Sequence, residues 1–288
     1  MHGGRRAIFR GDGGEPLVVI LGTNEIASAV AARLARSGAQ VIMGHDPFPP
    51  VIRRGMAFHD ALYDDRAEVA GVAGVVAESV IELVDALARG CCVAVTPLQL
   101  TDLITLRTPD VVIDARMQKH RVTPDLRGLT RLAIGLGPNF VAGGNCHVAI
   151  ETHPAATGAL LSTGRTRAAD GIARDLGGVG RERLLYAPRA GVWRTALDVG
   201  ARVFKGIVIG HHDGLPLIAP LDGLLRGIAR DGAFAPPDVK LVEIDPRGRA
   251  AQFTGTDARG RAIAQAVLGA IQVANGQRAT RRIATTVH

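Results

Sequence analysis

The first half of the chain alternates short apolar runs with segments whose apolar residues recur every three or four positions. An apolar run at 17–21 leads through Gly22 to a segment with Ile26, Val30 and Leu34 on one helical face. Further apolar runs lie at 41–43, 92–95, 111–113 and 132–134, and a second helical pattern at Val76, Val80, Val84 and Leu87. Because strands that alternate with helices are typical of βαβ units, we predict an α/β fold with a Rossmann-like, doubly wound parallel sheet.

The second half changes to short apolar segments separated by glycines. The sequence Ala-Pro-x-x-Gly begins at Ala187 and again at Ala219, each time before an apolar segment. Two similar β units of this length are typical of the halves of a lipoyl- or biotinyl-like barrel-sandwich, so we predict a small all-β domain of this kind at 187–245. The turn at 210–214, between the halves, contains no lysine, and we therefore expect no swinging arm.

These patterns divide the chain into five parts. We predict a flexible N-terminus at 1–16, a Rossmann-like ligand-binding domain at 17–150, a β-rich domain at 151–255, a C-terminal helix at 256–273 and a basic tail at 274–288. A chain of 288 residues is long enough for two such domains, each with a core of its own.

Composition narrows the classes of partner. The net charge is +7, but Arg278, Arg281 and Arg282 carry much of it, which indicates a basic tail on a nearly neutral body. Aromatic residues make up 3% of the chain, too few for stacking platforms that bind single-stranded nucleic acid. No apolar run approaches the ~20 residues that cross a membrane. We expect a cytoplasmic protein that binds neither nucleic acid nor a membrane.

The turn after the first strand, Gly22-Thr23-Asn24-Glu25, lies where a dinucleotide fingerprint would be. In Gly-x-Gly-x-x-Gly the second glycine lets the backbone approach a pyrophosphate, and Asn24 occupies that position. NAD(P) is therefore disfavoured, whereas the helix N-terminus still offers free amides to a phosphate. Two interpretations stay open, a nucleotide or phosphate-ester site and a purely structural turn.

Further candidates follow the later strands. Arg53 and Arg54 are adjacent and suit an anionic group, because the guanidinium fork matches phosphate. That both are solvated surface residues is an equal alternative. The carboxyl ends of parallel strands meet at one edge of the sheet, where open α/β folds bind ligands. We predict a site for a small anionic ligand formed by Gly22, Thr23, Asn24, Glu25, Arg53, Arg54, Asp114, Arg116, Gly135, Gly137 and Asn139.

The sequence offers little for catalysis by side chains. Cys146 is the candidate for transient transport of sulfur or selenium. Cys91 and Cys92 lie at the start of a strand whose opposite end faces the ligand, and Cys146 is closer to that end of the sheet. His147 and Glu151 would hold a metal together only on one helix, and the apolar residues between them predict a strand, so we predict no metal site. No nucleophile stands beside a base, which favours a protein without turnover of its own.

Several of these segments together resemble the YqeB-type family, whose proteins are assigned to selenium-dependent molybdenum hydroxylase systems. The matching segments are Ile52-Arg53-Arg54, Ala57-Phe58, 114–117, 134–140, His147, 150–152 and 244–248, in order over most of residues 17–273. Two turns depart from the family pattern. Its Gly-x-Gly-Asp is here Gly22-Thr23-Asn24-Glu25, and its Pro-Gly-Phe is Pro138-Asn139-Phe140.

The resemblance implies an accessory protein in molybdenum hydroxylase maturation. Such a protein would bind a molybdopterin-type cofactor, or a related nucleotide or pterin phosphate, and dock a client molybdenum hydroxylase. Two alternatives are an NAD(P)-dependent oxidoreductase with a degenerate fingerprint and a non-catalytic scaffold. Whether the protein forms a homodimer stays open.

Overall fold

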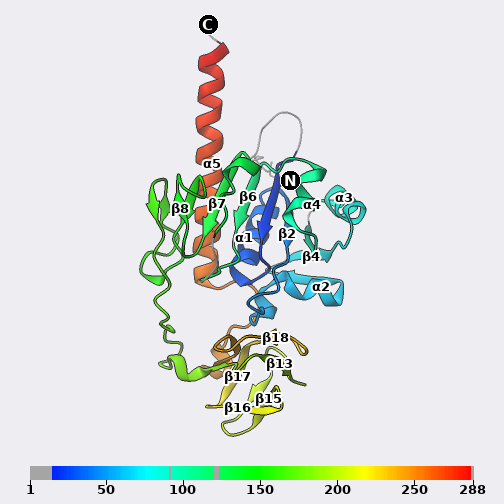
Figure 1. Cartoon of the computed structure of the whole chain (residues 1–288), viewed down its shortest axis with the longest axis vertical. Coiled ribbons are helices and arrows are strands. Elements are labelled where there is room, and N and C mark those ends of the chain that lie inside the picture. The colour runs from blue at the N-terminus through cyan, green and yellow to red at the C-terminus, as the bar shows by residue number, and fades with distance from the viewer. Residues whose placement is uncertain (1–14, 91, 120–122, 287–288) are drawn as a thin grey trace, which may run out of the picture.

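The computed structural model describes residues 15–90, 92–119 and 123–286. These residues form two lobes, a sheet lobe built around nine strands and a β-rich lobe made from residues 184–245 (Figure 1). The segment predicted as a flexible N-terminus lies almost entirely outside the described residues, as does the very end of the predicted basic tail.

The large sheet has the strand order β10-β9-β7-β6-β1-β2-β5-β4-β3. Its strands are β1 (Leu17–Leu21), β2 (Gln40–Gly44), β3 (Arg66–Val69), β4 (Val72–Val76), β5 (Cys92–Thr96), β6 (Val111–Asp114), β7 (Leu132–Leu136), β9 (Val148–Ile150) and β10 (Leu160–Leu161). A short separate pair consists of β8 (Val141–Ala142) and β11 (Gly164–Arg165). The central strands are buried on both faces, which explains why they read as continuous apolar runs.

The prediction of a doubly wound parallel sheet was wrong, because the sheet is mixed. Its central strands pair in parallel, whereas β3 joins β4 and β10 joins β9 in antiparallel fashion. The β3–β4 turn has positive φ at Ala70 and Gly71, and alanine there is not a usual hairpin signal. The second predicted helix is confirmed over Val80–Arg89, but Val76 belongs to β4, and Val80 and Val84 are exposed rather than on the buried face.

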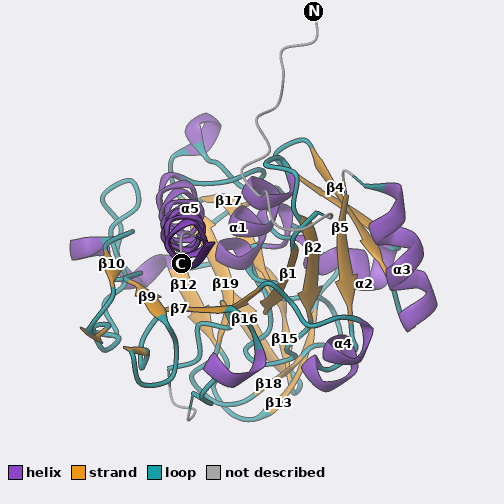
Figure 2. Ribbon diagram, turned by 90° about the horizontal axis from the view of Figure 1, so that it is seen from above, coloured by secondary structure: helices purple, strands orange, loops and turns teal. Residues whose placement is uncertain are grey.

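Helices cover both faces of the large sheet (Figure 2). They are α1 (Glu25–Ala35), α2 (Ala61–Asp64), α3 (Val80–Arg89), α4 (Leu100–Leu106) and α5 (Ala258–Thr286). α1 and α5 supply apolar side chains to the core on one face, and Leu83 of α3 and Leu103 of α4 belong to the core on the other. Among the described residues, no helix combines the length and apolar character needed to cross a membrane.

The long helix α5 connects the two ends of the fold. It begins near the β-rich lobe, packs along α1 and then projects beyond the sheet (Figure 1). It continues through 274–286, where the sequence predicted a basic tail. This segment contains three alanines and three arginines, which favour helix, and no proline.

The β-rich lobe consists of two four-stranded antiparallel sheets. Its strands are β12 (Leu184–Tyr186), β13 (Gly191–Arg194), β14 (Arg202–Val203), β15 (Val208–His212), β16 (Leu215–Ile218), β17 (Gly223–Ile228), β18 (Phe234–Ala235) and β19 (Lys240–Asp245). One sheet has the order β12-β19-β17-β14 and the other β16-β15-β13-β18. Trp193 lies fully buried in their common core and donates from Nε1 to the carbonyl of Ala229.

The description of this lobe as a lipoyl- or biotinyl-like barrel-sandwich was also wrong. One strand of the first sheet, β12, lies outside the predicted bounds 187–245. The sheet lobe contributes as well, because Ile228 donates its amide to the carbonyl of Ile52. This hydrogen bond joins the lobe to the rest of the fold at the end of β17, which a repeat pattern does not reveal.

Candidate functional site

The loops after β1 and β6 contact each other at a place that we call the strand-end crevice. Asn24 caps α1, accepting from the amides of Ile26 and Ala27, and its Nδ2 donates to the carbonyl of Ala115 at 2.7 Å. Gly22 has φ +102°, and a Cβ there would lie 3.1 Å from the Cα of Arg116. Protein atoms thus fill the place where a Rossmann fold brings its backbone to a pyrophosphate.

Arg116, which the sequence predicted to bind an anionic ligand, is already paired with a carboxylate of the protein. Its Nε and terminal nitrogen donate to the two carboxylate oxygens of Asp114 at 3.0 and 2.7 Å, and its amide donates to the same group. The hydrogen bond to Asp114 is the largest cause that raises the pKa of Arg116. The same Asp-x-Arg fork occurs at Asp125–Arg127 and Asp245–Arg247. It therefore fixes loops rather than leaving a guanidinium available.

The glycines after β7 serve packing. A Cβ on Gly135 would lie 2.0 Å from the ring of Phe140, so only glycine fits beneath that ring. Gly137 has φ +105°, and a Cβ there would lie 3.0 Å from the sulfur of Met117. Asn139 also has positive φ, and its Nδ2 donates to the carbonyl of Lys119 at 3.1 Å. These residues shape the loop next to the crevice.

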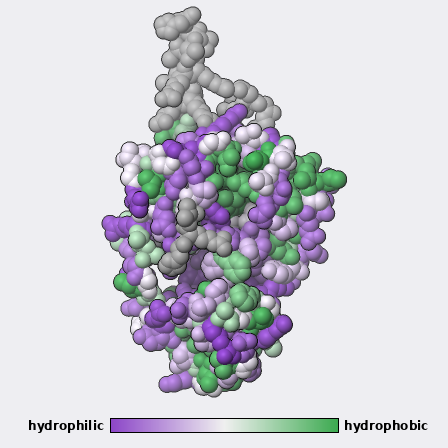
Figure 3. Space-filling view, viewed as in Figure 1, coloured by the Kyte–Doolittle hydropathy of each residue, from purple (hydrophilic) through white to green (hydrophobic). Residues whose placement is uncertain are grey.

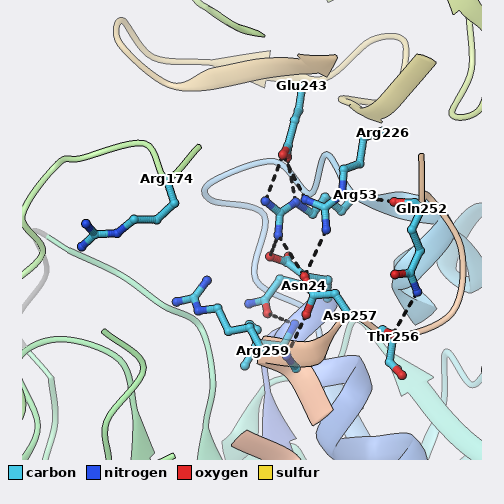
Figure 4. Close-up of polar contacts among 12 residues, drawn as sticks. Asn24, Arg53, Arg174, Arg226, Glu243, Gln252, Thr256, Asp257 and Arg259 are labelled. Atoms are coloured by element: carbon cyan, nitrogen blue, oxygen red, sulfur yellow. Dashed lines mark hydrogen bonds and ion pairs between the residues drawn. The ribbon is translucent and has the colours of Figure 1, made fainter. Parts of the chain in front are cut away.

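A second assembly, the arginine cluster, surrounds Glu243 between the two lobes (Figure 4). Arg53 binds the carboxylate through two nitrogens at 2.7 and 3.1 Å, Arg183 at 2.5 Å and Arg226 at 3.0 Å. Burial alone would raise the pKa of Glu243, but the three guanidinium groups hold it well below its usual range. Glu243 is therefore an anion at neutral pH.

The arginine cluster extends to the N-terminus of α1 and to the start of α5. Arg53 also pairs with Glu25 at 3.1 Å, and Arg226 pairs with Asp257 at 3.1 Å. Of the predicted site residues, Glu25 and Arg53 thus meet here, whereas Arg54 turns elsewhere, to Asp60 and to the carbonyl of Ile228. The cluster joins side chains that are far apart in the sequence, with Arg53 and Glu243 separated by 190 residues.

Two cations beside this cluster lack an acidic partner within ion-pair distance in the described part of the chain. Arg259 donates from Nε and a terminal nitrogen to the carbonyl of Thr152 at 3.2 and 3.0 Å. Burial is the largest cause that lowers the pKa of Arg259, and Arg53 lowers it further, whereas Glu25 and Asp257 act in the opposite direction. Burial likewise lowers the pKa of Lys240, although Glu243 and Glu25 act in the opposite direction. The surface between the lobes is hollowed and hydrophilic (Figure 3).

The sulfur-carrier candidate Cys146 lies fully buried. Burial raises the pKa of its thiol to about 11, so the thiolate that would carry sulfur or selenium is disfavoured at neutral pH. Thr23, another predicted site residue, is buried against His59, whose Nδ1 lies 2.9 Å from the threonine Oγ1. Burial lowers the pKa of His59 to about 3, so its imidazole is neutral.

No group of three or more potential metal ligands occurs within the residues that the structure describes. His147 and Glu151 are engaged with the backbone. His147 accepts the amide of Ala133 at 2.8 Å, and Glu151 accepts the amides of His153 and Arg167 at 2.7 and 2.8 Å. Both side chains therefore hold neighbouring loops in place.

Sequence reasoning missed most of the arginine cluster and its surroundings. The residues concerned are Arg183, Arg226, Lys240, Glu243, Asp257 and Arg259. Only Glu243 carried a local signal, since it stands at an inward position of an apolar strand, where an unpaired carboxylate would be costly.

Comparison with known proteins gives one strong match in sequence. The chain is 36% identical over 279 residues to "Uncharacterized protein YqeB" from Escherichia coli (strain K12), a match that covers 94% of this chain. The chain is a homologue of YqeB. It spans about half the length of that relative, since the match covers 50% of YqeB. No family model matches the chain. The YqeB resemblance is thus supported, while the name assigns no activity.

Similar solved structures include an aspartoacylase family protein from Mesorhizobium loti and a succinylglutamate desuccinylase/aspartoacylase from Rhodobacter sphaeroides. The first is 14% identical and covers 82% of this chain and 87% of its own, with a TM-score of 0.25. The second is 14% identical and covers 81% and 86%, with a TM-score of 0.24. At these TM-scores the similarities carry no argument about the activity of this chain.

The prediction of a maturation protein for a molybdenum hydroxylase was wrong. The related YqeB is uncharacterized, so its name gives that role no support. The geometry also speaks against it, because the crevice predicted to hold a pterin phosphate is closed by Asn24 and its arginine is paired with Asp114. The molybdopterin-type cofactor and the client hydroxylase were inferred from that role, and no observation on this chain bears on either.

Proposed function

We propose that this protein binds a small oxyanionic molecule, with a carboxylate or phosphate group, between its two lobes. The observation that carries the proposal is the pair Arg259 and Lys240, two half-buried cations without an acidic partner within ion-pair distance in the described part of the chain. A half-buried cation without a counter-ion is costly, and an anionic ligand supplies that counter-ion.

The balance of charge around the arginine cluster supports this. Three carboxylates, those of Glu25, Glu243 and Asp257, face five cations, namely Arg53, Arg183, Arg226, Lys240 and Arg259. Glu243 is saturated by its three arginines, and Arg226 shares Asp257 with Arg53. The excess of positive charge therefore lies with Arg259 and Lys240, which the acids of the cluster attract without forming an ion pair with either.

The cluster also prepares these cations for a ligand. Arg259 is held by its two bonds to the carbonyl of Thr152, which fix the orientation of its guanidinium before any ligand arrives. The neighbouring Arg53 is likewise held in one orientation, by its hydrogen bonds to Glu243 and Glu25. Binding to such pre-oriented groups loses little side-chain entropy, so each charged hydrogen bond contributes more of its free energy to affinity.

Thermal unfolding with added anions tests the proposal. Phosphate and citrate should raise the melting temperature of the whole chain above the value in sodium chloride of equal ionic strength, because a ligand that binds only the folded state stabilises it. Arg259→Gln should remove most of this shift.

Arg261→Gln is the matched control, because Arg261 stands two positions further along α5, is exposed and donates only to the carbonyl of Thr256. Its shift should equal that of the wild type. Equal shifts in all three proteins, or none in the wild type, would overturn the proposal.

A further inference from the structure

Two histidine rings lie next to each other at the carboxyl edge of the large sheet. His45 directly follows β2, and its amide donates to the carbonyl of Thr96 at 2.9 Å, which fixes the residue at the end of the strand. His59 belongs to the short 3₁₀ turn Phe58–Asp60 and is 5% exposed. The ring centroids are 5.3 Å apart and the ring planes are tilted by 43°, so the rings are neighbours that do not stack.

One nitrogen of His45 is buried without a partner. Its Nδ1 makes no hydrogen bond with any residue that the structure describes. A buried polar atom left unsatisfied costs about 1–3 kcal/mol. In a folded protein such an atom commonly marks the place of a bound water molecule or ion. The nitrogen of His45 therefore indicates that a ligand binds here.

His59 is held in the manner of a metal-binding histidine. Its Nδ1 lies 2.9 Å from Oγ1 of Thr23, which is itself 2% exposed. When Nδ1 donates its proton to this oxygen, the lone pair of the ring lies on Nε2. Histidines that bind metal ions almost always use their second nitrogen in this way, because the hydrogen bond fixes the tautomer and the ring orientation.

The distance between the two rings matches one shared ion. With metal–nitrogen bonds of about 2.0–2.1 Å at a tetrahedral angle, the centroids of two bound imidazoles lie about 5.2 Å apart, whereas a linear arrangement needs about 6.4 Å. The observed separation is 5.3 Å. Burial also lowers the pKa of both rings, although Asp46 opposes this at His45, so each is in the neutral form that binds metal ions.

The charges around the pair do not repel a cation. The charged neighbours are Arg54, Arg230, Asp46, Asp60 and Asp64. Each arginine is paired with an acid, Arg54 with Asp60 at 2.6 Å and Arg230 with Asp64 at 2.7 Å. Asp46, next to His45, adds a negative charge that attracts a cation.

We propose that His45 and His59 together bind one divalent transition-metal ion. Imidazole is a ligand that suits zinc, nickel and copper. No third histidine, cysteine, aspartate or glutamate joins the pair to form a metal-binding group among the described residues, so water completes the coordination of the ion. The inference is independent of the proposed anion site, because the two use different residues.

Calorimetric titration of Zn²⁺ into the whole protein tests this. One ion should bind, and His45→Gln and His59→Gln should each weaken binding by at least about tenfold, because either substitution removes one of two protein ligands. His211→Gln is the matched control, since His211 is an exposed histidine on β15, and its affinity should equal that of the wild type.

X-ray absorption at the zinc edge identifies the ligands of the wild-type complex without any substitution. The spectrum should show two imidazoles with oxygen neighbours and no sulfur. If either variant does not fold, this spectrum alone decides. Absence of binding, a sulfur ligand or an equal loss in His211→Gln would overturn the proposal. Unchanged affinity in His45→Gln or His59→Gln would overturn it as well, since the ion would then be bound adventitiously elsewhere.

Discussion

The strand-end crevice and the arginine cluster both contain arginines and carboxylates, but they differ in how charge is balanced. In the crevice, Arg116 is neutralised by Asp114 two residues before it, and Asn24 closes the remaining space. In the cluster, Glu243 is shared by three arginines from distant parts of the chain, and Arg259 and Lys240 beside it have no acid of their own in the described residues.

This difference separates a structural ion pair from a candidate ligand site. A guanidinium with both donor edges on one carboxylate has little left for a ligand, whereas a half-buried cation without a counter-ion gains one when an anion binds. A dense group of charges is thus not by itself evidence of a ligand site. The evidence is the presence, at the border of the group, of cations that have no ion-pair partner.

Removing the shared carboxylate should give the largest effect. Glu243→Gln leaves three buried guanidinium groups without their common anion, and loss of one partner from a buried ion pair typically costs about 3–5 kcal/mol. Urea unfolding at neutral pH measures this free energy.

Asp213→Asn is the control, because Asp213 forms an exposed pair with Arg189. Exposed pairs contribute about 0–1 kcal/mol, so this variant should change little. Equal effects of the two substitutions would mean that the arginine cluster contributes no more than a surface pair.

A substitution that disturbs the close packing of the two loops in the strand-end crevice should give the next largest loss of unfolding free energy. Gly22→Ala combines positive φ with a Cβ 3.1 Å from the backbone of Arg116, so unfolding free energy should fall by about 1–3 kcal/mol or more. Gly38→Ala has a similar φ of +89° but no atom within 4 Å of the added Cβ. A loss at Gly22 no greater than that at Gly38 would show that the two loops are not closely packed.

The pH dependence of the unfolding free energy should reveal the contribution of Glu243. Because the pKa of Glu243 is held well below its usual value, its stabilising effect is complete above the unfolded pKa of about 4.3 and is lost as the pH falls below it. Urea unfolding between pH 7 and 3 should therefore show a steeper loss of stability for the wild type than for Glu243→Gln. Parallel curves would contradict the lowered pKa of Glu243.

Much of the sheet lobe could be predicted from local pattern. The apolar runs at 17–21 and 132–134 lie in β1 and β7, since strands buried on both faces are apolar throughout. The edge of the sheet could not be predicted in this way, because three of the four residues of β3 are partly or fully exposed and the hairpin turns at Ala70. In α3, likewise, the buried residues are Leu83 and Ala86, whereas the periodicity favoured Val80 and Val84.

The candidate site was predictable only where partners are close in sequence. Asp114 and Arg116 stood out as a motif, and they turned out to pair with each other. Arg53 was a sound candidate, but its partner Glu243 is 190 residues away and no motif links them. Arg259 and Lys240 are ordinary charged residues in sequence. Their importance depends on which acids are absent around them in the described fold, and this is a property of tertiary structure.

The measurement that tests the account most directly is calorimetric titration of phosphate into the wild type, Arg259→Gln and Arg116→Gln. A charged hydrogen bond is worth about 1.5–3 kcal/mol, so Arg259→Gln should weaken binding about tenfold or more. Arg116→Gln should weaken it less than about twofold, because Asp114 already occupies that guanidinium. The reverse order would place the ligand in the strand-end crevice and contradict the assignment of anion binding to the cations beside the arginine cluster.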